Sequence, residues 1–303
     1  MGVTATVRPF DVALSGRDLT RIGDLVPAEA EAILDLALEL KRDPQPLTPR
    51  KTLGLYFTKH STRTRTSFAV AMTQLGGASL QLQAEEMHLS RGESLEDTAR
   101  VLSRYLDTIA IRTGPQAEVD AWAEAASIPV INALTDDEHP CQALADGLTI
   151  RERLGGTNGV RIAWVGDGSN VCVSLARLAP MLGMEMVVAA PAGYEPALEG
   201  VQVTRDAREA AAGADVLVTD TWISMGQEEE RDRRLRALEP YRLDRELLDL
   251  AAPEAIVLHC LPAHPGEEIA ADVLYGPQSA VWDEAENRLH TQKALLALLL
   301  GAA

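Results

Sequence analysis

The sequence predicts an α/β protein with two domains, each a parallel sheet flanked by helices. Strand-like and helix-like segments alternate almost throughout the chain, which is typical of parallel α/β architecture. The length of 303 residues is enough for two hydrophobic cores. A Gly-rich break at residues 155–159 separates two halves of similar pattern. With 46% hydrophobic and 24% charged residues, the composition is that of an ordinary globular protein.

In the first half, short apolar runs predict buried strands at residues 53–57, 78–82, 108–111 and 130–132. Helices are expected between them, at residues 62–75, from Ser94 onward and at residues 117–126. The first should end at Gly76-Gly77, since glycine is the favoured residue beyond a helix C-terminus. The second should begin with a capping box in which Ser94 caps the helix and Asp97 takes the place of Glu.

The second half repeats this pattern. Strands are predicted at residues 162–165, 186–190, 216–219 and 256–258, with helices between them that include residues 171–182. A helix at residues 142–154 should bridge the halves. The apolar residues of a last helix, 284–300, predict that it docks on the protein rather than forming a free tail.

Charge and cysteine content exclude several classes of function. The net charge of −17 argues against nucleic-acid binding, which needs a basic surface. No apolar run reaches the ~18 residues that a membrane span needs, and the N-terminus lacks the pattern of a secretory signal. Three scattered cysteines do not make a disulfide framework. We therefore expect a cytoplasmic protein without a membrane or nucleic-acid partner.

The run from Ser61 to Phe68 (STRTRTSF) lies between a predicted strand and a predicted helix. The N–H groups at a helix N-terminus, together with the helix dipole, bind anions such as phosphate. Arg63 and Arg65 add planar guanidinium groups that match phosphate oxygens. The alternative is a Ser/Thr-capped surface helix with two solvated arginines.

Four further polar clusters follow predicted strands, where open α/β sheets bind their ligands. They are Arg112, His139-Pro140-Cys141-Gln142, Asp220-Thr-Trp-Ile-Ser-Met-Gly226 and His259-Cys260-Leu261-Pro262. Taken one by one, each has a structural explanation. Arg112 suits a surface ion pair, His139 the neighbourhood of a helix cap and Gln142 a solvated first turn, while Asp220 suits a cap and Cys260 a small buried apolar residue. That all five clusters follow strands favours a functional site.

A metal site at His259, Cys260 and His264 is a weaker alternative, because their spacing matches no standard zinc pattern. A dinucleotide fingerprint at Val165-Gly-Asp-Gly-Ser-Asn170, which would indicate a nicotinamide dehydrogenase, is also weak. Cys172 and Val173 stand where that pattern needs its third small residue.

Together, four motifs resemble those of the aspartate/ornithine carbamoyltransferase family: Ser61-Thr-Arg-Thr-Arg65, His139-Pro-Cys-Gln142, His259-Cys-Leu-Pro262 and Glu286-Asn-Arg288. The segment Asp220-Thr-Trp-Ile-Ser-Met-Gly226 and the His-Cys-Leu-Pro run resemble the ornithine branch. The resemblance covers essentially the whole chain, in order.

The resemblance implies a role for each matching residue. Ser61, Thr62, Arg63 and Thr64 would hold the phosphate of carbamoyl phosphate. Arg112 would bridge the phosphate and the carbonyl oxygen, His139 would donate to that oxygen, and Gln142 and the Leu261 carbonyl would orient the carbamoyl amide. Arg288 would add positive charge. The residues implied to bind L-ornithine are Asn170, Asp220, Ser224 and Met225, with Cys260 and Asp220 near the δ-amine.

The family also implies an organisation. Residues 1–138 with the C-terminal helix 284–303 would form the carbamoyl phosphate domain, residues 139–154 a linking helix and residues 155–283 the ornithine domain. The C-terminal helix would pack on the N-terminal domain. The reaction, carbamoyl transfer to the ornithine δ-amine in arginine biosynthesis, would need no cofactor and no metal. A homotrimer with active sites near its subunit interfaces is expected.

Ser224-Met-Gly226 and the charged residues 227–236 would form a lid over ornithine, although a solvated charged helix explains those charges equally well.

Three positions depart from the family pattern: Ala69 for Glu, Ser169 for Asn and Pro265 for Arg. The alternatives within the family are enzymes that act on aspartate, putrescine or an N-acylated ornithine. An aspartate enzyme would want a basic residue for the side-chain carboxylate, and a putrescine enzyme would have no use for an α-carboxylate site. A non-enzymatic relative is disfavoured because His139, Gln142, Cys260 and Arg288 are all present.

Overall fold

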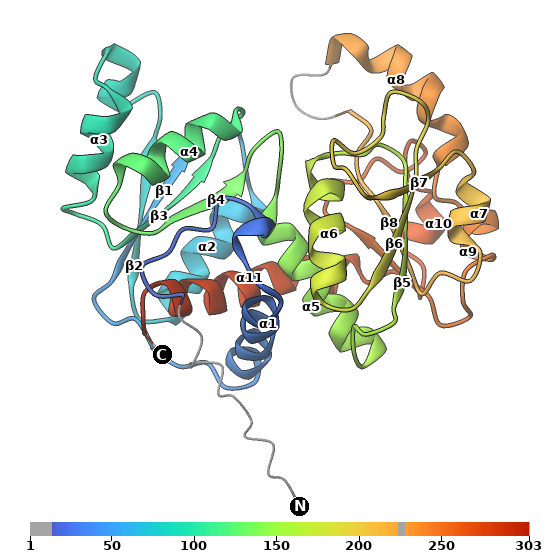
Figure 1. Cartoon of the computed structure of the whole chain (residues 1–303), viewed down its shortest axis with the longest axis horizontal. Helices are drawn as coiled ribbons and strands as arrows, with labels where there is room; N and C mark the ends of the chain where they lie inside the picture. The colour runs from blue at the N-terminus through green and yellow to red at the C-terminus, as the bar shows by residue number, and fades with distance from the viewer. Residues whose placement is uncertain (1–13, 224–227, 303) are drawn as a thin grey trace, which may run out of the picture. The chain divides into compact units, whose positions relative to one another are not determined.

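The computed structural model describes residues 14–223 and 228–302. By its internal contacts the chain divides into two compact units (Figure 1): Met1–Leu144 with Arg288–Ala303, and Ala145–Asn287. The divisions fall inside two helices, α5 (Pro140–Leu154) and α11 (Val281–Leu299). The predicted linking helix, residues 139–154, contains the first of them. The C-terminal part of α11 belongs to the first unit, as the resemblance implied.

The first unit is built on a four-stranded parallel sheet in the order β2-β1-β3-β4. Its strands are β1 (Thr52–Phe57), β2 (Ala78–Gln83), β3 (Thr108–Arg112) and β4 (Val130–Leu134). Its helices, besides the parts of α5 and α11, are α1 (Pro27–Arg42), α2 (Arg63–Gln74), α3 (Leu95–Leu102) and α4 (Gln116–Ala125), with short 3₁₀ turns at Ile22–Asp24 and His88–Arg91.

Strands β1, β3 and β4 are largely buried because helices cover the sheet (Figure 1). The prediction of a buried strand at residues 78–82 is wrong in one respect, since β2 is an edge strand whose residues are all exposed or partly exposed. Val119 and Trp122 of α4 and Ala99 of α3 pack in one apolar cluster with Tyr56 of β1 and Ile111 of β3. Helix α2 packs against β1 and β2. Its predicted C-terminus is confirmed: Gly76 has φ +84°, and its N–H donates to the Thr73 carbonyl at 3.0 Å.

The second unit carries a five-stranded parallel sheet in the order β7-β6-β5-β8-β9. Its strands are β5 (Arg161–Val165), β6 (Glu185–Ala189), β7 (Gln202–Thr204), β8 (Val216–Thr219) and β9 (Ile256–His259). Its helices include α6 (Asn170–Met181), α7 (Ala207–Ala211), α8 (Arg231–Leu238), α9 (Arg245–Leu248) and α10 (Ala271–Leu274), with 3₁₀ turns at Glu228–Glu230 and Glu239–Tyr241. Figure 1 shows α6 on one face of this sheet and α7, α9 and α10 on the other.

Each strand order contains one topological switch point, where successive connections leave in opposite directions. In the first unit it lies between β1 and β3, and in the second between β5 and β8. Open α/β sheets bind ligands at the carboxyl ends of the strands at such points. Four loops are therefore marked by topology alone: those that follow β1, β3, β5 and β8.

All eight predicted strands are present, within one or two residues of the predicted limits. The sequence reasoning missed α1, although its signals are clear. Pro27 occupies the first turn, and Glu29 accepts a hydrogen bond from the Val26 N–H at 3.0 Å. Buried apolar residues then recur at helical spacing, from Ala30 to Leu40. It also missed β7, α7, α9 and α10, which have three to five residues each and leave little periodicity to detect.

Helix α3 confirms the capping prediction at Ser94, whose hydroxyl oxygen accepts the Asp97 N–H at 3.0 Å.

Candidate active site

The loop after β1 leads into the N-terminus of α2. Thr62 is the N-cap, has a helical backbone conformation and makes no side-chain capping bond. The first turn of α2 contains no acidic residue. The N–H groups of a first helical turn have no partner within the helix, and the helix dipole is positive there. The predicted phosphate cradle, Ser61 to Thr64, therefore lies where an anion is stabilised.

Arg112 ends β3, directly beside this loop. The β3–β4 register shifts between Ile111 and Arg112, and an irregularity of this kind re-aims the side chain that follows it. The Arg112 carbonyl accepts the Thr58 N–H at 3.0 Å. The β1 and β3 loops are thereby fixed to each other at the switch point.

Arg288 of α11 connects two of the other predicted residues. Its Nη1 donates to Gln142 Oε1 at 2.5 Å, and its Nη2 donates to the Thr64 hydroxyl oxygen at 2.9 Å. Arg288 is only 3% exposed. Three elements far apart in the sequence thus contribute one buried cationic cluster, because a guanidinium can serve several acceptors at fixed angles.

His139 precedes α5 and is also buried. Burial, together with the charges of Arg288, Arg112 and Arg63, holds the pKa of His139 well below its usual value. The imidazole is therefore neutral at pH 7 and can donate a hydrogen bond from one ring nitrogen only. Three guanidinium groups around a neutral imidazole suit a doubly charged phosphate and a carbonyl oxygen that gains negative charge.

In the second unit, Asp220 follows β8 and collects donors from three segments. The Cys260 thiol donates to its Oδ1 at 3.0 Å and the Thr221 N–H to the same oxygen at 2.7 Å, while the Ser169 hydroxyl donates to Oδ2 at 3.0 Å. Burial of the thiol, and then the Asp220 carboxylate, raises the pKa of Cys260 well above its usual value. Cys260 is therefore a neutral thiol rather than a nucleophilic thiolate.

Asn170 is the first residue of α6 and follows Ser169 directly. Its Oδ1 accepts the Val171 N–H at 3.0 Å. The β5 loop therefore brings an amide close to Asp220 through its neighbour Ser169. Two other predicted ornithine contacts, Ser224 and Met225, lie outside the described residues.

A network that the sequence reasoning did not find fixes the turn after Cys260. His259 Nε2 lies 3.1 Å from Glu268 Oε1, and the Leu261 N–H donates to His259 Nδ1 at 2.9 Å. Because Nδ1 accepts, the proton of the neutral ring lies on Nε2. Leu261 has φ +58°, which a non-glycine residue adopts only when its surroundings hold it there. The sequence marked His259 as part of the His-Cys-Leu-Pro motif and as a metal alternative, but not as a partner of Glu268.

The structure does not bring together the three residues of the alternative metal site, His259, Cys260 and His264. His259 and Cys260 group with Asp220, while His264 groups with Glu267 and Glu268, so the three proposed ligands are not one set. His264 Nδ1 also lies 3.2 Å from the Thr221 hydroxyl.

The glycines of the β5 loop do not indicate a dinucleotide. A Cβ on Gly168 would lie 2.2 Å from the backbone nitrogen of Pro196, and one on Gly166 would lie 3.0 Å from Trp222 Nε1. Both glycines are thus required by packing against the protein itself, which explains them without a bound cofactor.

The structure therefore defines an α/β protein of two compact units, with a cationic cluster in one unit and an acidic, thiol-bearing cluster in the other. Comparison with known proteins shows its family. Residues 17–152 match the carbamoyl-P binding domain of aspartate/ornithine carbamoyltransferase, and residues 158–299 match the Asp/Orn binding domain. The chain belongs to the aspartate/ornithine carbamoyltransferase family.

Individual proteins of this family are similar to the chain over nearly its full length. An ornithine carbamoyltransferase of Nostoc punctiforme is 52% identical over 96% of this chain and 99% of its own length. That of Acidothermus cellulolyticus is 54% identical over 92% of this chain and 95% of its own. The solved structure of the Pyrococcus furiosus ornithine carbamoyltransferase superimposes with a TM-score of 0.91 at 46% identity, covering 96% of this chain and 99% of that one. No helix among the described residues is both long and apolar enough to cross a bilayer.

Proposed function

We propose that the protein transfers the carbamoyl group of carbamoyl phosphate to the δ-amine of L-ornithine, giving L-citrulline and phosphate. The observation that carries this is the buried cluster of Arg288 with Thr64 and Gln142, next to a neutral His139. Its charge and hydrogen-bond donors suit carbamoyl phosphate. The names of the relatives, all ornithine carbamoyltransferases, support the acceptor.

In the proposed mechanism the neutral δ-amine attacks the carbonyl carbon, and negative charge develops on the carbonyl oxygen. Arg112, His139 and Thr64 stabilise that oxygen, as donors in an oxyanion site do. The bond between the carbonyl carbon and the phosphate oxygen then breaks, and its electron pair leaves with phosphate. The nitrogen loses a proton, which balances the departing phosphate as hydrogen phosphate. Ser61, Thr62 and Arg63 bind the phosphate, while Gln142 and the Leu261 carbonyl orient the carbamoyl amide.

The acceptor is assigned to the second unit. Asn170, Asp220, Ser224 and Met225 bind ornithine in this proposal. Asp220 carries the negative charge that an amino group requires. Cys260 lies near the δ-amine as a neutral thiol, and its hydrogen bond to Asp220 at 3.0 Å fixes the orientation of the carboxylate. Because the amine must be neutral to attack, the rate should rise with pH.

We also propose the organisation that the resemblance implies. Residues 1–138 with 284–303 bind carbamoyl phosphate, residues 139–154 link the domains and residues 155–283 bind ornithine. The protein works in the cytoplasm, in arginine biosynthesis, as a homotrimer with active sites near its interfaces. In the first unit Leu80, on the edge strand β2, is 50% exposed, and Val70 of α2 is 39% exposed, as expected of a surface that a second copy covers. Light scattering should give about three times the chain mass of 32.6 kDa.

Measuring product formation with alternative acceptors tests the activity. Purified protein should convert carbamoyl phosphate and L-ornithine to citrulline and phosphate. Parallel reactions with aspartate, putrescine and N-acetylornithine should be slower in kcat/KM. A better rate with any of these acceptors would replace the ornithine assignment by the corresponding sister activity.

A further inference from the structure

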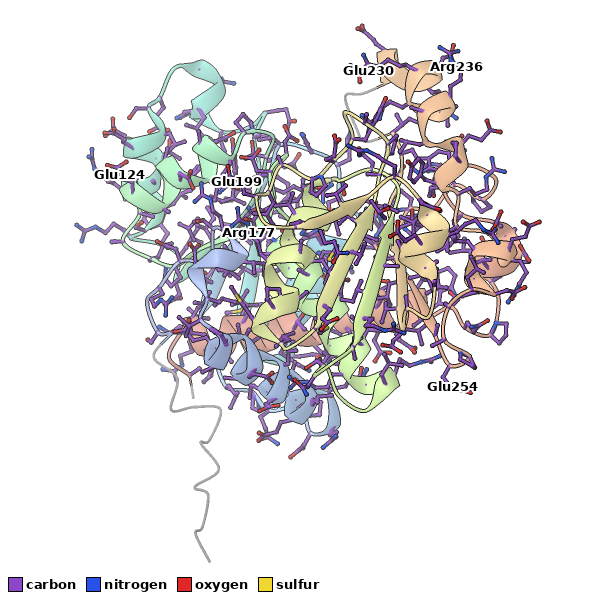
Figure 2. The ribbon with its side chains drawn as sticks, turned by 45° about the vertical axis from the view of Figure 1, so that its right-hand side comes forward. Glu124, Arg177, Glu199, Glu230, Arg236 and Glu254 are labelled. Atoms are coloured by element: carbon purple, nitrogen blue, oxygen red, sulfur yellow. The ribbon has the colours of Figure 1, made fainter. Side chains whose placement is uncertain are left out.

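Arg234 of α8 differs from the charged residues around it. Its side chain is 7% exposed, whereas that of Arg233 is 67% exposed. Figure 2 shows the side chains of Glu230, the residue before α8, and of Arg236, in its last turn, at the surface. Glu230 forms ion pairs within this segment, with Arg233 at 2.7 Å and with Arg234 at 3.9 Å. A solvated helix therefore accounts for most of this charged run but not for Arg234.

The guanidinium of Arg234 contacts three segments of the second unit. Its Nη2 forms an ion pair with Asp167 Oδ2, and its Nε donates to the Trp222 carbonyl at 2.5 Å. Its Cζ lies 5.0 Å from the centroid of the Tyr194 ring. One planar group thus fixes two loops at once, which a lysine ammonium at this place does not do with the same geometry.

These two loops are the ones that carry the predicted ornithine contacts. Asp167 lies in the β5 loop, two residues before Ser169 and three before Asn170. Trp222 lies in the β8 loop, two residues after Asp220 and two before Ser224. The loops also touch elsewhere, through the Ser169 hydroxyl on Asp220 at 3.0 Å.

A buried ion pair is weak evidence for stability, because well-packed apolar residues often stabilise a core as much. A buried ion pair does fix the position of the two segments that it joins, since its hydrogen bonds are directional. We propose that Arg234 is a positioning residue for the acceptor: it holds the β5 loop and the β8 loop in the relative position that binds the amino and carboxylate groups of ornithine. This inference rests on the proposed function and deepens it.

Asp167 makes the same contact dependent on pH. Burial raises the pKa of Asp167 to about 6 although Arg234 opposes the shift. The other groups that interact with Asp167 are Asp220, which raises its pKa further, and the buried Cys172 thiol of α6. Below about pH 6 Asp167 takes up a proton, and the ion pair with Arg234 is lost.

The sign of the accompanying stability change separates positioning from unfolding. Because the pKa of Asp167 is higher in the folded protein than the ordinary value of 3.8, the folded state binds the proton first between about pH 6 and 4. This group therefore favours folding more at pH 5 than at pH 7. A loss of ornithine affinity at pH 5 through this contact is not a loss of fold.

Steady-state kinetics of three variants tests the proposal. Arg234→Met should raise KM for ornithine roughly tenfold, the effect of losing one charge-assisted contact, and change KM for carbamoyl phosphate less than twofold. Arg234→Lys keeps the charge beside Asp167 but loses the Nε bond to Trp222, so its ornithine KM should lie between wild type and Arg234→Met. Arg236→Met, two residues away on the same helix and exposed, is the matched control and should behave as wild type.

The outcomes are distinguishable. If wild type forms no citrulline, the proposed function is wrong. If it does, and Arg234→Lys or Arg234→Met leaves the ornithine KM unchanged or raises both KM values equally, Arg234 has no positioning role. If Arg234→Met does not fold, Arg234→Lys decides, with its melting temperature measured alongside.

Asp167→Asn, which resembles the protonated state, should show at pH 8 the raised ornithine KM that wild type reaches only below about pH 6. A wild-type KM at pH 8 in Asp167→Asn would overturn the pH dependence.

Discussion

The two units place opposite chemistry at the same topological position. Each has a parallel sheet with one switch point, and each brings polar groups from the loops at that point together with groups from neighbouring elements. In the first unit the buried group is a guanidinium, Arg288, and the neighbouring His139 is kept neutral. In the second the carboxylate of Asp220 accepts hydrogen bonds, and the thiol of Cys260 is kept protonated.

This difference teaches that the strand order determines where a ligand binds, whereas a few side chains determine which ligand. A cationic cluster with a neutral hydrogen-bond donor suits an acyl phosphate, and an acidic cluster with a neutral thiol suits an amine. The four predictions below test this division, from the largest expected effect to the smallest.

The largest effect is expected for Arg112→Met in the first unit. Arg112 ends β3 at the register shift and lies among the proposed donors to the carbonyl oxygen. Loss of one such donor typically lowers kcat by about 10²–10³-fold. Arg104→Met, an exposed arginine of the same unit, should retain wild-type kcat. Equal kcat in wild type and Arg112→Met would remove Arg112 from the oxyanion site.

A smaller effect, specific to one substrate, is expected for Arg63→Ala. It should raise KM for carbamoyl phosphate roughly tenfold and leave KM for ornithine unchanged, because a charge-assisted hydrogen bond to phosphate is lost. Arg65→Ala is the comparison. Arg65 lies over the Phe57 ring, 5.4 Å from its centroid, so its loss should lower the melting temperature rather than change KM. Similar KM values for Arg63→Ala and wild type would exclude the phosphate contact.

The neutral state of His139 has a consequence for stability. Because the pKa of His139 is well below its usual value of 6.5 in the folded protein, the unfolded chain alone binds a proton as the pH falls below 6.5. His139 should therefore reduce the free energy of unfolding by roughly 1.4 kcal/mol per pH unit below that point. Urea unfolding at pH 7 and pH 5 measures this, with His139→Gln expected to lose less stability. The same loss in both proteins would mean that His139 is protonated when folded.

The smallest effect concerns Cys260 in the second unit. Its raised pKa predicts slow alkylation by iodoacetamide at pH 7.5, since the thiolate reacts. Asp220→Asn removes a cause of the raised pKa and should accelerate alkylation several-fold. Mass spectrometry of the Cys260 peptide measures the rate, and the buried Cys141 of the first unit, whose pKa does not depend on Asp220, serves as an internal control. Faster alkylation of Cys260 in wild type than in Asp220→Asn would contradict the assignment.

Much of the fold was predictable because its signals are local. A buried strand of a parallel sheet is a short apolar run, and helix ends such as Ser94 and Gly76 are marked by their own residues. The positions of the polar clusters were predictable for a related reason, since they directly follow the predicted strands.

The supporting contacts were not predictable. Arg234 sits in a run of charges that looks solvated, and only the tertiary structure shows that one of them is buried. The His259–Glu268 pair likewise depends on a turn that brings residues nine positions apart into contact at 3.1 Å. Pattern distinguishes apolar from polar residues, but it does not distinguish a buried charge from an exposed one.

Direct binding of carbamoyl phosphate tests the division of labour most simply. Isothermal titration of freshly prepared carbamoyl phosphate should be done with wild type, Arg63→Ala and Asp220→Asn. We predict that Asp220→Asn binds as wild type does, while Arg63→Ala binds roughly tenfold more weakly. Weakened binding in Asp220→Asn together with wild-type binding in Arg63→Ala would contradict the assignment of carbamoyl phosphate to the first unit.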